Sequence, residues 1–454
     1  MGNFRPNKWD TPFLLPPSID DWLPKDHVAR FVVEVVERLD LSELEQAYER
    51  RGSMAYDPAM LLALLIYGYA TGVFSSRAIE RATYDSVAFR FIASDQHPDH
   101  DTIANFRKRF LKEFQALFLQ VLRIAKESGL LKLGTVALDG TKVHANASRH
   151  SALSYEHAQK IEAQLQEEVQ KLTQMAEQAD QSQVPDGLKI PEELARREER
   201  LKVIAEAKAE IERRAQERAQ REQAEYEAKL AARKKREEET GKKPGGKPPE
   251  PPSSTPLPKD QVNLTDPDSR IMKVAGGGFD QSYNAQAAVA VDSMLVVATE
   301  VTQAANDKGQ VVPMLDKLTA LPEELGKVER GLWDSGYMSA ANVAASEQAG
   351  IEPMIAMGRE SHHTGLLERF APAPAAVPPA EASPVQKMVH RLKTPEGKRA
   401  YALRKQTVEP VFGIIKSVMG FRQFRLRGLE NVRGEWSLVT MAWNLKRIFA
   451  LQGA

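Results

Sequence analysis

Two aspartates in this chain stand where a carboxylate could do chemistry. Asp139 follows the apolar run TVAL and precedes Gly140, and Asp334 follows GLW and precedes a serine and a glycine. A carboxylate at the end of a buried strand costs free energy unless a cation or hydrogen bonds compensate it. Each aspartate taken alone is explained as well by a cap on the turn that follows it. The shared context therefore predicts either two turn caps or one site that needs cations.

Glu409 is the third candidate acid, and it lies in the basic segment YALRKQTVEPVFGIIK. At about 100° per residue, a helix would place Tyr401 and Lys405 on the same face as Glu409, and Lys416 continues that face. This pattern predicts a carboxylate in a positively charged groove, although an amphipathic helix with a solvated charged face has the same spacing. Pro410 disfavours helical geometry at Glu409 and predicts a kink or a helix start there.

The three acids favour a hard divalent cation as their partner. The chain has no cysteine, which excludes disulfides, thiolate zinc sites, iron–sulfur ligation and a cysteine nucleophile. Mg²⁺ binds proteins through a few carboxylates together with substrate phosphates. Two such ions about 4 Å apart can activate an attacking oxygen and stabilise a leaving oxygen in phosphodiester exchange. Asp139, Asp334 and Glu409 are therefore predicted to be both catalytic residues and ligands of Mg²⁺ or Mn²⁺, with two ions expected.

Basic residues are concentrated around Glu409, although the whole chain has 62 Lys and Arg against 62 Asp and Glu. Between Lys387 and Arg427, eleven Lys or Arg face only two acids, Glu396 and Glu409, so the segment carries 11 − 2 = +9. Segregated positive charge of this kind is typical of a surface that binds a polyanion. The segment therefore predicts contact with a nucleic acid.

The segments that must position these residues form four parts. Residues 1–131 have apolar residues at helical spacing and predict an all-helical domain. Residues 132–153 and 262–454 alternate strand and helix patterns and predict one mixed α/β domain, in which the first strand ends at the first aspartate. Residues 154–240 predict a charged, coiled-coil-like antiparallel helical hairpin that interrupts this domain. Residues 241–261, rich in Pro, Gly and Lys, predict a flexible linker.

The charged hairpin allows three roles: self-association, contact with DNA along its basic residues, or an inert insertion. Its heptad spacing favours self-association, whereas Lys208 at a seam position disfavours an independent coiled coil. Elsewhere the chain has no apolar run of about 18 residues and no N-terminal export pattern. We therefore expect a soluble, cytoplasmic protein without a membrane partner.

Four segments carry motifs of one known family. ALDGTKVHANASRH is similar to the strand that bears the family's first aspartate, GLWDSGYMS to that of the second, and RKQTVEPVFGIIK to the helix that bears its glutamate. PDHDTIANFRKRF is similar to the segment that precedes the catalytic domain. In this combination the chain resembles the DDE-type transposases of bacterial insertion sequences, over most of its length. The resemblance implies a ribonuclease H-like mixed sheet with flanking helices, preceded by a helical DNA-binding domain.

The resemblance also implies an activity. Asp139, Asp334 and Glu409 would bind the divalent ions, water would attack at the inverted-repeat ends of the insertion sequence, and the freed 3′-hydroxyl would attack target DNA. The implied partners are double-stranded DNA, as transposon end and as target, and further copies of the chain in the DNA complex. Two alternatives remain open: a metal-dependent DNA nuclease or recombinase without strand transfer, and a non-enzymatic DNA-binding protein derived from a transposase.

The family often has Tyr, two residues, Arg, three residues, Glu, six residues and Lys. Glu409 and Lys416 fit this spacing, but Tyr401 and Arg404 come one residue too early. Either Lys405 takes the place of the arginine, which the helix face favours, or a local bulge restores Arg404. The resemblance implies that these basic residues and Tyr401 contact DNA.

Two further segments have both a functional and a structural interpretation. Arg107, Lys108 and Arg109 are candidates for DNA backbone contact, and a solvated helix face also explains them. Asn306 and Asp307 close the turn after the third predicted strand, where they either approach the site or serve only as turn residues.

Overall fold

The computed structural model describes residues 18–48, 54–177, 189–241, 247–358 and 382–453. It divides into two compact units, each described separately below. The first unit comprises residues 1–145, 272–278 and 282–454, and the second comprises residues 146–271 and 279–281. In the described part of the chain, no single helix is long and apolar enough to cross a membrane. One bent pair of helices, Pro58–Thr71 with Ser76–Asp85, is long and apolar enough together, judged by length and composition only.

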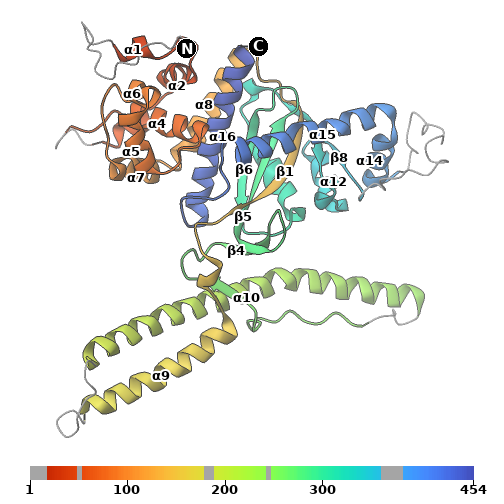
Figure 1. Cartoon of the computed structure of the whole chain (residues 1–454). Helices are drawn as coiled ribbons and strands as arrows, with labels where there is room; N and C mark the ends of the chain where they lie inside the picture. Colours follow the sequence, from red (N-terminus) through yellow and green to blue (C-terminus); the bar gives the residue numbers. More distant parts are fainter. Residues whose placement is uncertain (1–17, 49–53, 178–188, 242–246, 359–381, 454) are drawn as a thin grey trace, which may run out of the picture. The chain divides into compact units, whose positions relative to one another are not determined.

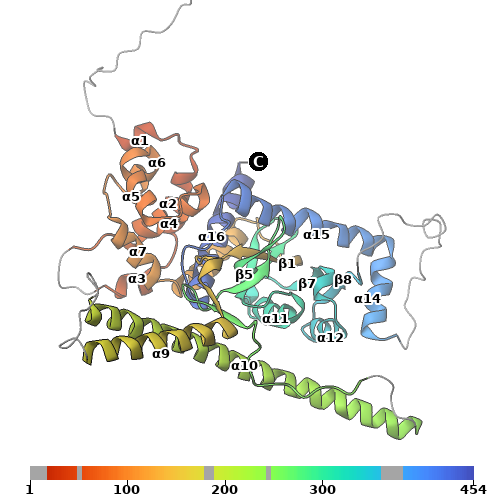
Figure 2. The ribbon, with the colours of Figure 1, turned by 60° about the horizontal axis from the view of Figure 1, so that its bottom comes forward.

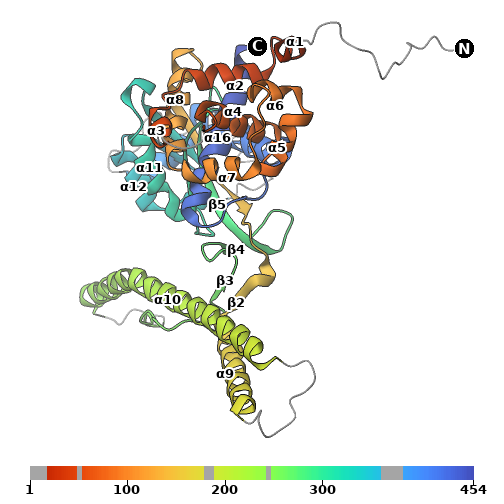
Figure 3. The ribbon, with the colours of Figure 1, turned by 90° about the vertical axis from the view of Figure 1, so that its left-hand side faces the viewer.

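The N-terminal part of the first unit is helical, as the sequence predicts. Its helices are α1 (Ile19–Trp22), α2 (Val28–Glu37), α3 (Ser42–Gln46), α4 (Pro58–Thr71), α5 (Ser76–Asp85), α6 (Val87–Ile92), α7 (His100–Arg109) and α8 (Glu113–Glu127). Helix α4 is apolar on all sides and is buried between its neighbours, because such a helix has no face for water. Figure 3 shows α4 surrounded by α2, α5, α6 and α7, all of which contact it.

A mixed sheet forms the centre of the first unit. Its strands are β1 (Gly134–His144), β4 (Arg270–Lys273), β5 (Phe279–Ala290), β6 (Val296–Thr302), β7 (Val328–Trp333) and β8 (Glu352–Ile355). The main path runs β4–β5–β1–β7–β8, and β6 also pairs with β5. Strand β5 is antiparallel to β1 and β6, whereas β1, β7 and β8 are mutually parallel. The predicted mixed α/β architecture is confirmed.

Helices cover this sheet. They are α11 (Val311–Thr319), α12 (Ala340–Gln348), α14 (Pro384–Lys393), α15 (Pro395–Gly413) and α16 (Leu429–Gln452), with short turns η2 (Lys308–Gln310), η3 (Glu323–Leu325), η4 (Ser335–Tyr337) and the π-helical η5 (Ile414–Val418). Helix α15 packs on β1 and β7, and α16 packs on β6 (Figure 1). Asn444 on α16 bonds both backbone groups of Val296 on β6, so a polar side chain fixes the helix to the sheet.

Two local expectations need correction. Strand β1 does not end at Asp139 and Gly140 but continues to His144, because β5 pairs with it as far as the register pair His144 and Ser282. Helix α15 neither starts nor stops at Pro410 and continues as an α-helix to Gly413. The proline removes only one backbone donor, the one that would reach the carbonyl four residues earlier.

The second unit is built on two long helices, α9 (Tyr155–Glu177) and α10 (Ile190–Thr240), with η1 (Arg149–Ser151) and the short strand pair β2 (Ala152–Ser154) and β3 (Gln261–Asn263). The helices are antiparallel, because Glu168 pairs with Arg197 and Glu162 pairs with Lys208 as the chain returns. Figure 2 shows α9 beside only part of α10, whose C-terminal part continues past it. Lys208 therefore has a carboxylate partner in the seam.

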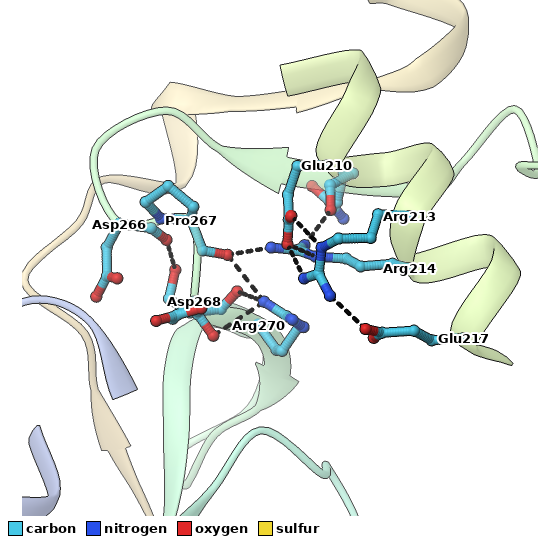
Figure 4. Close-up of polar contacts among 10 residues, drawn as sticks. Glu210, Arg213, Arg214, Glu217, Asp266, Pro267, Asp268 and Arg270 are labelled. Atoms are coloured by element: carbon cyan, nitrogen blue, oxygen red, sulfur yellow. Dashed lines mark hydrogen bonds and ion pairs between the residues drawn. The ribbon is translucent and has the colours of Figure 1, made fainter. Parts of the chain in front are cut away.

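The end of the predicted linker is fixed to α10. Residues 242–246 lie outside the described residues, and residues 247–260 contain no helix or strand. Asp260 accepts two hydrogen bonds from the guanidinium of Arg218. In Figure 4, Arg214 points from α10 towards Pro267, to whose carbonyl it donates, and it also pairs with Glu210 on its own helix. The segment that follows the linker is therefore held against α10 by arginines.

Candidate active site

Asp139 and Asp334 are brought together by the register of two parallel strands. Leu138 on β1 lies opposite Trp333, the last residue of β7, so the two aspartates follow neighbouring partners. Strand β7 ends there while β1 continues, and among the described residues the next backbone pairing of β1 outside its ladder with β5 is the isolated bridge of His144 with Gln423. Tyr401 on α15 donates its hydroxyl hydrogen to the carbonyl of Trp333 at 2.9 Å. The helix thereby fixes the strand end that carries Asp334.

One guanidinium, that of Arg404, joins all three candidate acids. Its Nη1 lies 3.0 Å from Oε1 of Glu409. Its Nη2 lies 3.2 Å from Oδ2 of Asp139 and 3.4 Å from Oδ1 of Asp334. The Arg404 side chain is only 7% exposed, whereas those of Asp334 and Glu409 are about half exposed. The three acids predicted from sequence therefore gather around one buried cation.

The charge of Asp139 is only partly compensated. Burial raises the pKa of its carboxyl group to about 6, against the opposing effects of Arg404 and of the Gly140 N–H, while Asp334 and Asp307 raise it further. Desolvation disfavours a charged carboxylate, and like charges nearby add to that effect. Both carboxylate oxygens already have a partner, since Oδ1 accepts from the Gly140 N–H at 2.8 Å and Oδ2 faces Arg404. Asp139 is thus a buried acid that favours more positive charge beside it.

A second polar cluster lies against Gly140. Oδ1 of Asp307 accepts hydrogen bonds from Asn284 at 2.6 Å and from Gln286 at 2.8 Å, and it lies 3.5 Å from Nζ of Lys142. A Cβ atom on residue 140 would lie 2.1 Å from the Gln286 side chain and 2.5 Å from that of Asp307. Only glycine leaves room for this cluster. Asp307, for which the sequence allowed a site or a turn role, therefore lies beside the first aspartate.

Tyr337 connects this cluster to the second aspartate. It ends the turn η4 that begins directly after Asp334, it is fully buried, and its hydroxyl donates to Oε1 of Gln286 at 2.5 Å. Asn284 and Gln286 were not predicted as site residues from the sequence. Their signal was two amides spaced two apart in the strand pattern NAQAAVA, which places both on one face.

The basic residues of the predicted Glu helix occupy different environments. Arg404, not Lys405, faces the acids, and Lys405 is exposed. No bulge separates Arg404 from Glu409, because α15 is α-helical throughout and the π turn comes after it. Nζ of Lys416 donates to the carbonyl of Lys142 at 2.7 Å, and burial, together with the charges of Lys142 and Arg422, lowers the pKa of Lys416 to about 8.

Of the three basic residues on α7 that were candidates for contact with the DNA backbone, Arg107 is buried. It is 6% exposed, and its guanidinium donates to the Tyr69 hydroxyl at 3.1 Å and to the Phe74 carbonyl at 2.9 Å. The Tyr69 hydroxyl donates in turn to the buried Glu435, whose pKa is raised mainly by burial. Arg107 lies on the buried face of α7 and is not placed to contact DNA. Lys108 and Arg109 are exposed on the same helix.

The chemistry of the acids fits a hard divalent cation, although they now face an arginine. Their donors are carboxylate oxygens on β1, at the end of β7 and on α15, which are the ligands that Mg²⁺ and Mn²⁺ accept. Within the described ranges, no three Asp, Glu or His side chains lie close enough together to hold an ion as they stand. The positive charge among these acids is supplied by Arg404.

Comparison with known families agrees with these observations. Residues 17–109 match the model of a transposase domain (DUF772), and residues 376–449, which include α15 and Glu409, match that of a transposase DDE domain. No curated protein and no solved structure matches the chain. Two transposase matches on one chain support a DDE-type transposase of an insertion sequence.

Proposed function

We propose that the protein cleaves DNA at the inverted-repeat ends of an insertion sequence and transfers the freed 3′ end to target DNA. The observation that carries this proposal is the convergence of Asp139, Asp334 and Glu409 on Arg404. Three acids from three separate elements, one of them with its pKa raised to about 6 mainly by burial, are typical of a functional site.

The order of the strands supports a ribonuclease H-like catalytic domain. In the path β6–β5–β1–β7–β8, strand β5 runs antiparallel to both of its neighbours, β6 and β1, and the two strands β7 and β8 lie parallel to β1 on its other side. In the proposed division, residues 1–131 bind DNA and residues 132–153 with 262–454 form the catalytic domain. Residues 154–240 are a helical insertion, and residues 241–261 are a linker.

In the proposed mechanism, Asp139, Asp334 and Glu409 would hold two divalent ions. These ions, when bound, supply activation of the attacking oxygen and neutralisation of the leaving oxygen. Asp139 is the least exposed of the three acids, and the bonds of its Oδ1 with Gly140 and of Tyr401 with Trp333 fix the positions of the two aspartates. Preorganised ligands of this kind lower the cost of reaching the reactive geometry.

The exposed basic residues would bind the DNA. Lys405, Lys108 and Arg109 are exposed and positively charged, and Lys416 lies at the end of β1 beside the site. Phosphate contacts by such residues supply affinity that falls as the salt concentration rises. We propose that several copies of the chain, in the cytoplasm, act together on two DNA ends, with the α9–α10 hairpin as a candidate for self-association.

Cleavage of labelled DNA carrying the gene's flanking sequences tests the proposal. The wild type should cut at the element ends with Mg²⁺ or Mn²⁺ and not with EDTA, and Glu409→Gln should lose these cuts. Glu396→Gln is a matched control, because Glu396 lies on the same helix but is exposed and lies 3.9 Å from Arg330. Wild-type rates in Glu409→Gln would reject the assignment. Cut ends that are never joined to target DNA would instead indicate a nuclease.

A further inference from the structure

Arg404 has a set of contacts that a DNA-binding residue does not need. It pairs with all three candidate metal ligands through the two terminal nitrogens of one guanidinium. Its third nitrogen, Nε, is buried and has no hydrogen-bond partner. The contacts of the guanidinium with these acids therefore account for its position, and no bond at Nε adds to them.

We propose that Arg404 is a positioning residue that acts as a resident counter-cation: it holds Asp139, Asp334 and Glu409 together when no divalent ion is bound, and it competes with the ion for them. This inference rests on the proposed function, because it takes these three acids as the metal ligands. It adds a role for Arg404 that differs from the DNA contact predicted from the sequence.

The competition follows from which oxygens are occupied. Arg404 faces Oδ2 of Asp139, while the other oxygen of that carboxylate accepts from the Gly140 N–H. An ion that takes Asp139 as a ligand must therefore share or displace a partner that Asp139 already has. A guanidinium and a divalent cation also repel each other at such short range. Binding of the ion thus requires the contacts of Arg404 to weaken.

The charges explain why the arginine can yield. Three ionised acids and one guanidinium sum to −3 + 1 = −2, so Arg404 leaves two negative charges uncompensated. A divalent ion can supply that missing charge. Asp334 and Glu409 are about half exposed, so an ion can approach from their side, whereas the Asp139 side chain is 19% exposed. The arrangement is stable enough to hold the ligands and incomplete enough to accept an ion.

The test is Mn²⁺ binding by the full-length protein without DNA, measured by calorimetry. Arg404→Met removes the charge and keeps the side-chain volume. It should bind Mn²⁺ on the order of tenfold more tightly, because a competing occupied state lowers apparent affinity by the fraction it takes up. Its melting temperature in EDTA should fall, and Mn²⁺ should raise it by more than in the wild type. Arg404→Lys, whose single ammonium cannot contact three acids as a fork does, should lie between the two.

Arg391→Met is the matched control, because Arg391 is also partly buried and paired with a carboxylate, Glu352, away from the site. It should leave Mn²⁺ affinity unchanged. Equal or weaker Mn²⁺ binding by folded Arg404→Met and Arg404→Lys, in a protein whose wild type cleaves DNA with metal, would overturn the counter-cation role and leave the proposed function standing. If Arg404→Met does not fold, the Mn²⁺ affinity of Arg404→Lys relative to the wild type decides alone. DNA cleavage by the wild type that does not depend on Mg²⁺ or Mn²⁺ would instead reject the proposed function itself.

Discussion

The acid cluster of the first unit and the helical hairpin of the second use charge in opposite ways. In the cluster, three acids share one arginine, and burial raises the pKa of Asp139 to about 6. In the hairpin, acids and bases are matched, and hydrogen bonds from Arg213 and Arg214 lower the pKa of Glu210 to about 2. Matched charges stabilise a fold, whereas a surplus of one sign around a mostly buried acid is typical of a functional site. Charge imbalance, not charge density, therefore distinguishes the site.

The largest expected effect follows from neutralising one acid of each region. Asp139→Asn should lower the rate of DNA cleavage by on the order of 10³-fold or more, because it would remove a charged ligand from the proposed site of the ions that activate the attacking oxygen. Glu210→Gln should leave that rate within about twofold, because its partners are structural arginines. Single-turnover cleavage of end DNA measures both. Equal losses of cleavage rate in the two variants would show that charge imbalance does not distinguish the site from the rest of the fold.

The pH dependence of stability should differ in sign between the same two acids. The folded-state pKa of Asp139 is raised above its unfolded value, so its ionised form destabilises the fold above about pH 6, and this penalty disappears as the pH falls towards 4. A shift of about two units corresponds to at most about 3 kcal/mol. The folded-state pKa of Glu210 is lowered, so its contribution is present above about pH 4.5 and is lost only as the pH falls towards 2.

Urea unfolding of the metal-free protein at pH 7 and pH 5 measures this difference. All five tryptophans lie outside residues 146–271 and 279–281, so their fluorescence reports on the first unit. From pH 7 to pH 5 the wild type should gain stability relative to Asp139→Asn. Over the same interval, unfolding followed by circular dichroism should show that Glu210→Gln stays less stable than the wild type by an unchanged amount. A wild type that loses stability relative to Asp139→Asn over this interval would contradict the raised pKa of Asp139.

The smallest effect is expected in the hairpin seam. Lys208→Met removes the partner of Glu162, whose side chain is about one quarter exposed, and should cost about 1 kcal/mol of hairpin stability with no change in DNA cleavage. Thermal unfolding followed by helical circular dichroism provides the measurement. A large loss of cleavage in this variant would mean that the hairpin contributes to catalysis rather than only to its own fold.

Local patterns in the sequence were enough to predict the helical N-terminal region and the mixed sheet, and they singled out the three acids that contact Arg404. They failed where contacts between residues far apart in the sequence determine the local structure. The continuation of β1 past Asp139 depends on β5, which lies more than 130 residues later, and the Asp307 cluster depends on side chains from three distant segments. Helix geometry favoured Lys405 over Arg404 as the basic residue beside Glu409. Helical spacing gives only the direction of each Cβ atom and does not account for the reach of a long side chain. Arg107 differs from Lys108 and Arg109 only in the face of α7 on which it lies.

The pairing of β1 with β5 also sets the order in which the protein can be completed during synthesis. Residues 146–271 are translated between the two strands, and the second unit can fold while β1 still lacks its neighbour. At about 5–20 residues per second, the interval lasts roughly 6–25 s. Asp334 and then Glu409 leave the ribosome later still. A growing chain would therefore complete the proposed DNA-binding region before the proposed cleavage site.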